Sequence, residues 1–468
     1  MTDPAPYARP RRRSRPLMSL LAALTVVLAS GAARADVFLG NLSLSELNLN
    51  LGDISLADLP QDLTDLSLAD LGIDLGDLPL QDLPIDLSTL TLSDLSFLIG
   101  GFPPFCEEGT LPGNDEVYPD DHRIITCVPE SWNGGLVVYA HGYVSPGDPL
   151  GLPQEELLNG FAARVTTRLG FAFAATSFHK NGYAVEQGAS DIQALVEHFR
   201  QNVAPGAVSR VLLVGTSEGG LIVTQLMEQN GGDYDGAWVL CAPLGGANRQ
   251  VRHIGDFRAV FDVAFPTIFD FGVAGVPVTA AQNIEGYEMS IVDAFEASPD
   301  LVGELGQVMG ITVDPDDPEA PVATAMELLR YNLEGHGDLV EVAGGNPYGN
   351  LGRIYLGSHD DAGLNRQVER VIPSLQARGY MRDFYQPTGR VERPMVIMHT
   401  LYDPLVPFEH AVIYRALAEL AGSGGNVTVI PIPRYEHCDF TPIELLGGLA
   451  VLVARTGGLG AGGAAAVP

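Results

Sequence analysis

The sequence predicts an α/β protein, in which a mostly parallel sheet carries helices on both faces. Short apolar runs typical of buried strands alternate with helical segments over residues 123–242, and the alternation returns over 394–454. One of these strands, at 211–214, passes through a glycine-flanked turn directly into a helix. Strands that alternate with helices join through crossover connections, and such connections give a parallel sheet covered on both sides.

In chain order, strands are expected at 123–128, 135–141, 170–176, 211–214 and 235–242. Helices are expected at 155–169, at 185–201 and after the 211–214 strand. After the interruption, strands are expected at 394–399 and 426–432, and helices at 409–421 and 441–454. The apolar strands read as continuous runs, which is typical of strands that are buried on both faces.

The interruption, at 244–393, is rich in Phe, Val, Gly and Pro, with helical patches such as 323–333 and 364–378. It is expected to be a mainly helical insertion into a domain that spans 102–456. Its acidic run could bind calcium, but two interleaved prolines favour a solvated loop, and no metal site is predicted. The run consists of Asp314, Asp316, Asp317 and Glu319.

The N-terminus has the features of a signal peptide over residues 1–35. Five arginines between positions 9 and 15 precede an apolar stretch at 17–30, and Ala33-Arg34-Ala35 supplies a small-residue cleavage site. Later apolar runs are too short to cross a membrane. The chain is therefore expected to be exported, and so secreted or periplasmic; the pattern leaves open whether by the general or the twin-arginine route.

Residues 36–101 contain a Leu/Asp-rich repeat of twelve residues, with five copies between positions 42 and 101. Positions 1, 3, 6 and 10 of each copy are apolar, and neither Lys nor Arg occurs in the copies. Each copy is too short to bury its leucines alone. The repeat is interpreted as an acidic spacer or as a docking module for an apolar surface, a partner or the cell envelope. The Gly/Ala-rich end, 457–468, is expected to be disordered.

The net charge limits which partners the chain can bind, and the cysteines bear on the compartment in which it folds. The formal net charge of −32 argues against nucleic acid, whose phosphates require basic patches. Export makes disulfides possible. The favoured pairs are Cys106 with Cys127 and Cys241 with Cys438, and reduced thiols are the alternative.

The turn after the 211–214 strand reads Gly215-Thr216-Ser217-Glu218-Gly219, a G-x-S-x-G motif in the strand–turn–helix context that a nucleophilic serine requires. Such a serine needs a base, and the base needs an acid that fixes its tautomer. His437 and Asp403 each follow a late strand and are the candidates. The alternatives are His410 as the base and Asp360 or Asp361 as the acid.

A transition-state oxyanion needs two backbone N–H donors. One is expected from Glu218, directly after the nucleophile. The other is expected from Tyr143 in the loop His141-Gly142-Tyr143.

Over about residues 120–455, these motifs resemble the α/β-hydrolase superfamily, in its secreted serine esterase and lipase-like branch. The loop Tyr402-Asp403-Pro404 with Pro407 is similar to that of secreted esterases and of prolyl-oligopeptidase-type hydrolases. The resemblance implies hydrolysis of a small or polymeric carboxylic ester without a cofactor, with 244–393 as a cap. A serine peptidase of the same fold is one alternative. A non-enzymatic surface or adhesion protein that works through the repeat is the other.

Overall fold

The computed structural model describes residues 102–113, 120–153, 160–311 and 320–458. The predicted signal peptide, the twelve-residue repeats, the acidic run and most of the C-terminal tail lie outside these residues. Within the described ranges, no helix combines the length and the apolar character needed to cross a membrane.

The described residues form one eight-stranded sheet in the order β1-β2-β4-β3-β5-β6-β7-β8. Strand β2 pairs antiparallel with both β1 and β4. All other neighbouring strands pair parallel. This order is that of the α/β-hydrolase fold, and it confirms the predicted fold class. The strands are β1 (Cys106–Leu111), β2 (His122–Cys127), β3 (Gly135–Ala140), β4 (Ala172–Thr176), β5 (Arg210–Thr216), β6 (Gly236–Leu240), β7 (Met395–Tyr402) and β8 (Val427–Tyr435).

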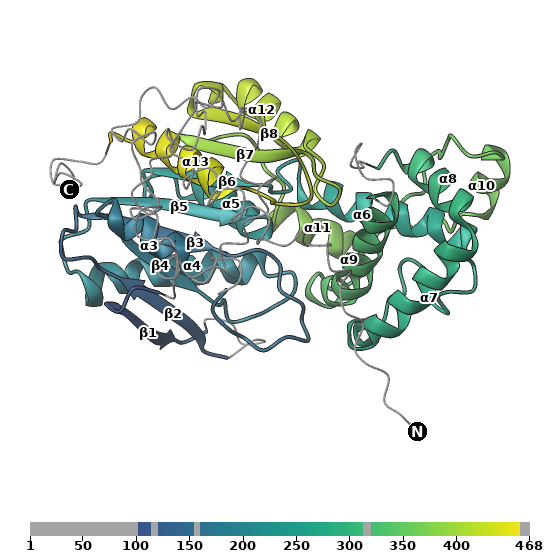
Figure 1. Ribbon diagram of the computed structural model, residues 1–468, viewed down its shortest axis with the longest axis horizontal. Coiled ribbons are helices and arrows are strands. Elements are labelled where there is room, and N and C mark those ends of the chain that lie inside the picture. The colour runs from purple at the N-terminus through teal and green to yellow at the C-terminus, as the bar shows by residue number, and fades with distance from the viewer. Residues whose placement is uncertain (1–101, 114–119, 154–159, 312–319, 459–468) are drawn as a thin grey trace, which may run out of the picture.

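Helices cover both faces of the sheet (Figure 1). In β3, Leu136 and Val138 belong to the apolar cluster of one face, while Val137 and Tyr139 belong to that of the other. This alternation is the period of two that a strand imposes on its side chains. The first face carries α4 (Val185–His198), α5 (Glu218–Gln229) and α12 (Glu409–Ala421), and the second carries α3 (Phe161–Arg168) and α13 (Pro442–Arg455).

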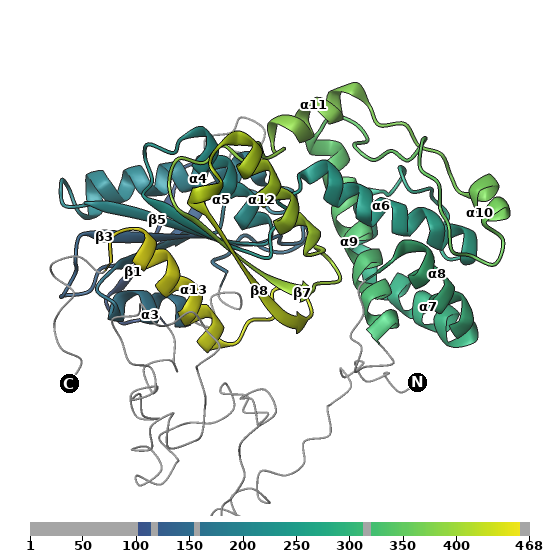
Figure 2. The same cartoon turned by 90° about the horizontal axis from the view of Figure 1, so that it is seen from above.

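A helical insertion separates β6 from β7 and lies beside the sheet, next to the ends of β7 and β8 (Figure 2). It has an apolar cluster of its own around Phe257, Phe261 and Leu329. Its helices are α6 (Ala247–Ala264), α7 (Ile284–Ala297), α8 (Pro299–Met309), α9 (Ala320–Val342), α10 (Asp361–Gln367) and α11 (Leu375–Asp383).

The helix predicted at 364–378 is wrong, because the structure divides this stretch between α10 and α11. Pro373 lies in the gap, lacks an N–H, and disfavours helical geometry in the residue before it. Ser374 then caps α11, and its hydroxyl accepts a hydrogen bond from the N–H of Ala377. The intervening Val371 donates its N–H to the side chain of Asn350, so the extended backbone is satisfied by a tertiary contact.

Candidate active site

Ser217 lies in the turn between β5 and α5, with φ of 53° and ψ of −117°. A non-glycine residue at positive φ stores strain, and such residues concentrate at functional sites. The turn is tight on both sides, because a Cβ at Gly215 would collide with the carbonyl of Gly219, and a Cβ at Gly219 would collide with that of Ala140. The two motif glycines therefore let β5, α5 and the end of β3 meet at the serine.

The three predicted residues meet at this turn. The Oγ of Ser217 lies 2.9 Å from Nε2 of His437, and Nδ1 of His437 lies 2.7 Å from Oδ2 of Asp403. Asp403 is completely buried. The residues come from three separate strand ends, those of β5, β7 and β8. A nucleophile, a base and an acid require such a hydrogen-bonded arrangement, and these roles for Ser217, His437 and Asp403 remain a prediction.

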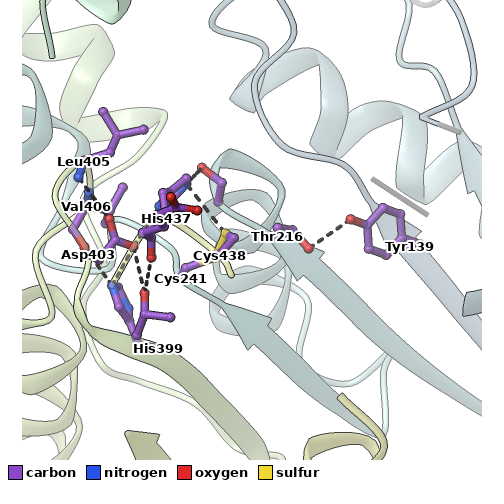
Figure 3. The surroundings of a disulfide bond; sticks show 12 residues. Tyr139, Thr216, Cys241, His399, Asp403, Leu405, Val406, His437 and Cys438 are labelled. Carbon is purple, nitrogen blue, oxygen red and sulfur yellow. Dashed lines mark hydrogen bonds and ion pairs between the residues drawn. A yellow bond between two sulfur atoms is a disulfide. The ribbon is translucent and has the colours of Figure 1, made fainter. Parts of the chain in front are cut away.

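Both carboxylate oxygens of Asp403 form hydrogen bonds (Figure 3). Its Oδ1 accepts the N–H groups of Leu405 at 3.0 Å and Val406 at 2.8 Å, which leaves Oδ2 for His437. Burial alone would raise the pKa of Asp403, but His437 and His399 together lower it to about 2. The carboxyl is therefore ionised at neutral pH and can stabilise a protonated His437.

The loop that carries His437 is constrained on both sides. Its neighbours Glu436 and Cys438 have φ of 77° and 58°. The carbonyl of Glu436 accepts a hydrogen bond from Thr400 at 2.9 Å, and Cys438 forms a disulfide with Cys241 (Figure 3). The bond ties the histidine loop to the end of β6, the strand beside β5.

Both predicted cysteine pairings are present in the structure. Cys106 bonds Cys127 across the antiparallel β1–β2 pair, where the two residues are direct partners. Cys241 and Cys438 are 197 positions apart in sequence. In the chain-entropy description, closing a loop of this length stabilises the fold by about 5 kcal/mol.

The alternative candidates lie elsewhere. His410 is buried, and its Nδ1 accepts the N–H of Gly245 at 2.9 Å. Burial lowers the pKa of His410 to about 3. Asp360 caps α10 by accepting the N–H of Gly363, and Asp361 accepts the N–H groups of Gly357 and Ser358. These residues have structural partners, and none of those contacts involves Ser217 or His437.

The predicted oxyanion donors border the same cavity as Ser217. Glu218 is the first residue of α5, so its N–H has no carbonyl four residues earlier within the helix. Tyr143 follows β3 in the loop that begins with His141, whose ring stacks on Phe178 at a centroid distance of 3.9 Å. Both Tyr143 and Glu218 line the cavity. Their role as donors remains a prediction.

Sequence reasoning missed the part played by the side chain of Glu218. Its carboxylate oxygen accepts the N–H of Ala184 at 2.6 Å in a buried position. Burial raises the pKa of Glu218 to about 8, against the opposing effects of that hydrogen bond and of the charge of Lys180. The residue after Ser217 therefore carries a carboxyl group that is mainly neutral at pH 7.

The raised pKa predicts a pH-dependent stability. Because the folded state keeps the Glu218 proton up to about pH 8 and an unfolded glutamate releases it near 4.3, folding takes up a proton between these values. The free energy of unfolding should fall as pH rises through this window, by up to about 1.4 kcal/mol per pH unit. In Glu218→Gln this decline should shrink, as measured by urea unfolding at pH 5.5 and pH 7.5. An equal decline in the variant would assign it to other groups.

Lys180, the only lysine in the sequence, links the insertion to the core. Its Nζ lies 2.8 Å from Oδ1 of Asp338 on α9, and both side chains are largely buried. The other oxygen of Asp338 accepts the N–H of Tyr183 at 2.7 Å. A lone lysine carries no sequence pattern that would reveal its partner 158 residues away.

Helix α9 also contacts the histidine loop. The hydroxyl of Thr324 lies 2.6 Å from that of Tyr435, two residues before His437. Glu327 lies one turn further along α9, and burial raises its pKa to about 7. The charge of His437 lowers this pKa, and the charge of Asp403 raises it. The insertion therefore places a titrating carboxyl in the electrostatic field of the Asp403–His437 pair.

No protein-family model and no curated protein matched the chain. Among solved structures, the acylaminoacyl peptidase of Pyrococcus horikoshii aligns with a TM-score of 0.37 and 10% identity over 71% of this chain, which spans 37% of that protein's length. A carboxyl esterase from Bacillus coagulans aligns with a TM-score of 0.38 and 12% identity, covering 75% of this chain and 97% of that one. A Pyrococcus furiosus esterase aligns with a TM-score of 0.39 and 12% identity, covering 76% of this chain and 96% of that one. The chain thus spans little over a third of the peptidase.

Proposed function

We propose that the protein is an exported serine hydrolase that cleaves carboxylic esters through an acyl-enzyme on Ser217. The observation that carries the proposal is the continuous link from Ser217 Oγ to His437 Nε2 at 2.9 Å and from His437 Nδ1 to Asp403 at 2.7 Å. Two disulfides fit export, since disulfides persist in oxidising compartments.

In the proposed reaction, Ser217 Oγ attacks the ester carbonyl while His437 Nε2 takes the hydroxyl proton. The ionised Asp403 stabilises the imidazolium that forms. The N–H groups of Glu218 and Tyr143 receive the negative oxygen of the tetrahedral intermediate. As the intermediate collapses, the C–O bond to the alcohol breaks and His437 returns the proton to the leaving oxygen. A water activated by His437 then attacks the acyl-enzyme, and its breakdown releases the carboxylic acid and restores the Ser217 hydroxyl.

The test compares ester and amide turnover by the same purified protein. We expect p-nitrophenyl acetate and butyrate to be hydrolysed, with kcat/KM well above that for N-acyl amino-acid p-nitroanilides. Ser217→Ala serves as the control for catalysis by contaminants. Higher kcat/KM on the anilides would replace the ester assignment by the peptidase alternative, and no turnover of either class would remove the hydrolase proposal.

Deletion of residues 42–101 is expected to leave hydrolysis of a soluble ester within about twofold of the full chain. The reason is that every residue of the proposed machinery lies between 143 and 437, and the described sheet begins at Cys106. Circular dichroism would verify that the deleted protein is folded. A folded deletion protein that has lost activity on p-nitrophenyl butyrate would place the repeat within the active site. Retained activity with lost binding to an apolar surface would support the docking interpretation of the repeat.

A further inference from the structure

The cavity in front of Ser217 has a volume of about 120 Å³ and is enclosed by both the core and the insertion. The core contributes Ser217, Glu218 and Tyr143, and the insertion contributes side chains from α6 and α9. A cavity of this small volume favours a short acyl group over a long one. Much of its wall is apolar, with Leu221, Val251, Ile254 and Leu339 among the lining residues.

Four residues of this lining each carry a buried polar atom that has no hydrogen-bond partner among the described atoms. These atoms are the hydroxyl of Tyr143, Oε1 of Gln250, Nδ2 of Asn332 and Nε2 of His336. Asn332 and His336 are 1% and 6% exposed. A buried polar atom without a partner destabilises the fold, so several of them around one cavity point to a ligand that pairs with them.

The orientation of Asn332 is fixed by its neighbour. Nη1 of Arg258 donates to Oδ1 of Asn332 at 2.9 Å, and arginine has donors only. Arg258 is itself held by Asp262 at 2.7 Å and by the carbonyl of Phe271 at 2.9 Å. The Nδ2 group of Asn332 is therefore a preset donor that is not used by the fold.

Gln250 supplies the complementary acceptor. Its Nε2 donates to the carbonyl of Leu405 at 2.8 Å, which leaves Oε1 as the free end of the amide. His336 lies one turn after Asn332 on the same face of α9. Burial, with the charge of Arg258, lowers the pKa of His336 to about 4, so its ring is neutral at pH 7. The Glu218 carboxyl is mainly neutral as well, so the groups around the cavity favour an uncharged polar ligand.

We propose, building on the esterase function proposed above, that this cavity selects short acyl groups that carry a hydroxyl oxygen. In the Ser217-bound acyl group, Asn332 Nδ2 donates to the hydroxyl oxygen and Gln250 Oε1 accepts the hydroxyl proton. A plain alkanoyl chain leaves both groups without partners. Sites built to bind a substrate hydroxyl discriminate strongly against analogues that lack it, for this reason.

The experiment compares p-nitrophenyl butyrate with both enantiomers of p-nitrophenyl 3-hydroxybutyrate, which share chain length and leaving group. The readout is the ratio of kcat/KM for the better hydroxy ester to that for the butyrate. The unmodified protein is expected to show a ratio of about 10- to 100-fold, after division by the ratio for hydroxide-catalysed hydrolysis.

Two variants and one control test whether this preference for the hydroxy ester depends on Asn332 and Gln250. Asn332→Asp keeps the acceptor for Arg258 and replaces the donor by a carboxylate oxygen. Gln250→Met removes the acceptor together with the hydrogen bond to the carbonyl of Leu405. Each is expected to lower the ratio about tenfold. Thr324→Val, on α9 but outside the cavity lining, is expected to leave the ratio unchanged.

A corrected ratio near one, or a high ratio that neither Asn332→Asp nor Gln250→Met lowers, would overturn the inference. In that case turnover of p-nitrophenyl butyrate that disappears in Ser217→Ala would still support the esterase function. Absence of turnover on all three esters would instead overturn the function on which the inference rests.

Discussion

Replacement of Ser217 by alanine is expected to lower kcat on p-nitrophenyl butyrate by roughly 10⁶-fold, the loss typical when a triad nucleophile is removed. His437→Ala should lose about as much, because the serine hydroxyl is a poor nucleophile unless a base takes its proton. The Oγ–Nε2 distance of 2.9 Å already places the two atoms for that transfer. Initial rates of p-nitrophenol release would measure both variants.

The double variant provides the sharper test, since residues that act as one unit do not lose activity additively. Ser217→Ala/His437→Ala should be at most a few-fold slower than either single variant. His410→Ala is the matched control, because His410 is a buried histidine that contacts Gly245 rather than the serine. Independent, multiplicative losses would show that the two residues do not share one proton transfer.

Asp403→Asn is expected to lower kcat by roughly 10⁴-fold, and the structure explains why so conservative a change is severe. Oδ1 of Asp403 accepts two backbone N–H groups, from Leu405 and Val406. In the variant the amide oxygen must take that place, so the NH₂ group faces Nδ1 of His437. The ring then carries its proton on Nε2 and cannot accept the proton of Ser217.

The measurement for this variant is kcat at neutral pH, with Asp360→Asn as the matched control. Asp360 caps α10 in the insertion, so its variant should hydrolyse the ester within about twofold of the unmodified protein. Activity within tenfold in Asp403→Asn would move the acid role to another residue. Equal losses in both variants would indicate a general effect on folding.

The sheet and the meeting of the three site residues could be predicted because they depend on local pattern and chain order. The strand at 211–214 and its glycines specify the turn at Ser217, and the ends of two late strands position Asp403 and His437. The edge strand β1 was missed, since Glu107 and Glu108 are exposed and show no apolar alternation. An exposed edge strand has little hydrophobic pattern to detect.

The insertion was predictable only as a helical region. Its break before Ser374 depends on Pro373, which lies within an otherwise helical pattern of residues. The unused polar atoms of Gln250 and Asn332 could not be predicted, because their availability depends on which tertiary contacts occupy the other end of each amide. The Lys180–Asp338 pair likewise joins residues that no local pattern connects.

Covalent labelling with a fluorophosphonate identifies the nucleophile itself, because this reagent is captured by a serine that a neighbouring base activates. We expect one adduct per chain, mapped by tandem mass spectrometry to Ser217, and greatly slowed labelling in His437→Ala. Ser217→Ala should form no adduct. An adduct on another serine, or undiminished labelling of Ser217→Ala, would contradict the assignment of Ser217 as the nucleophile.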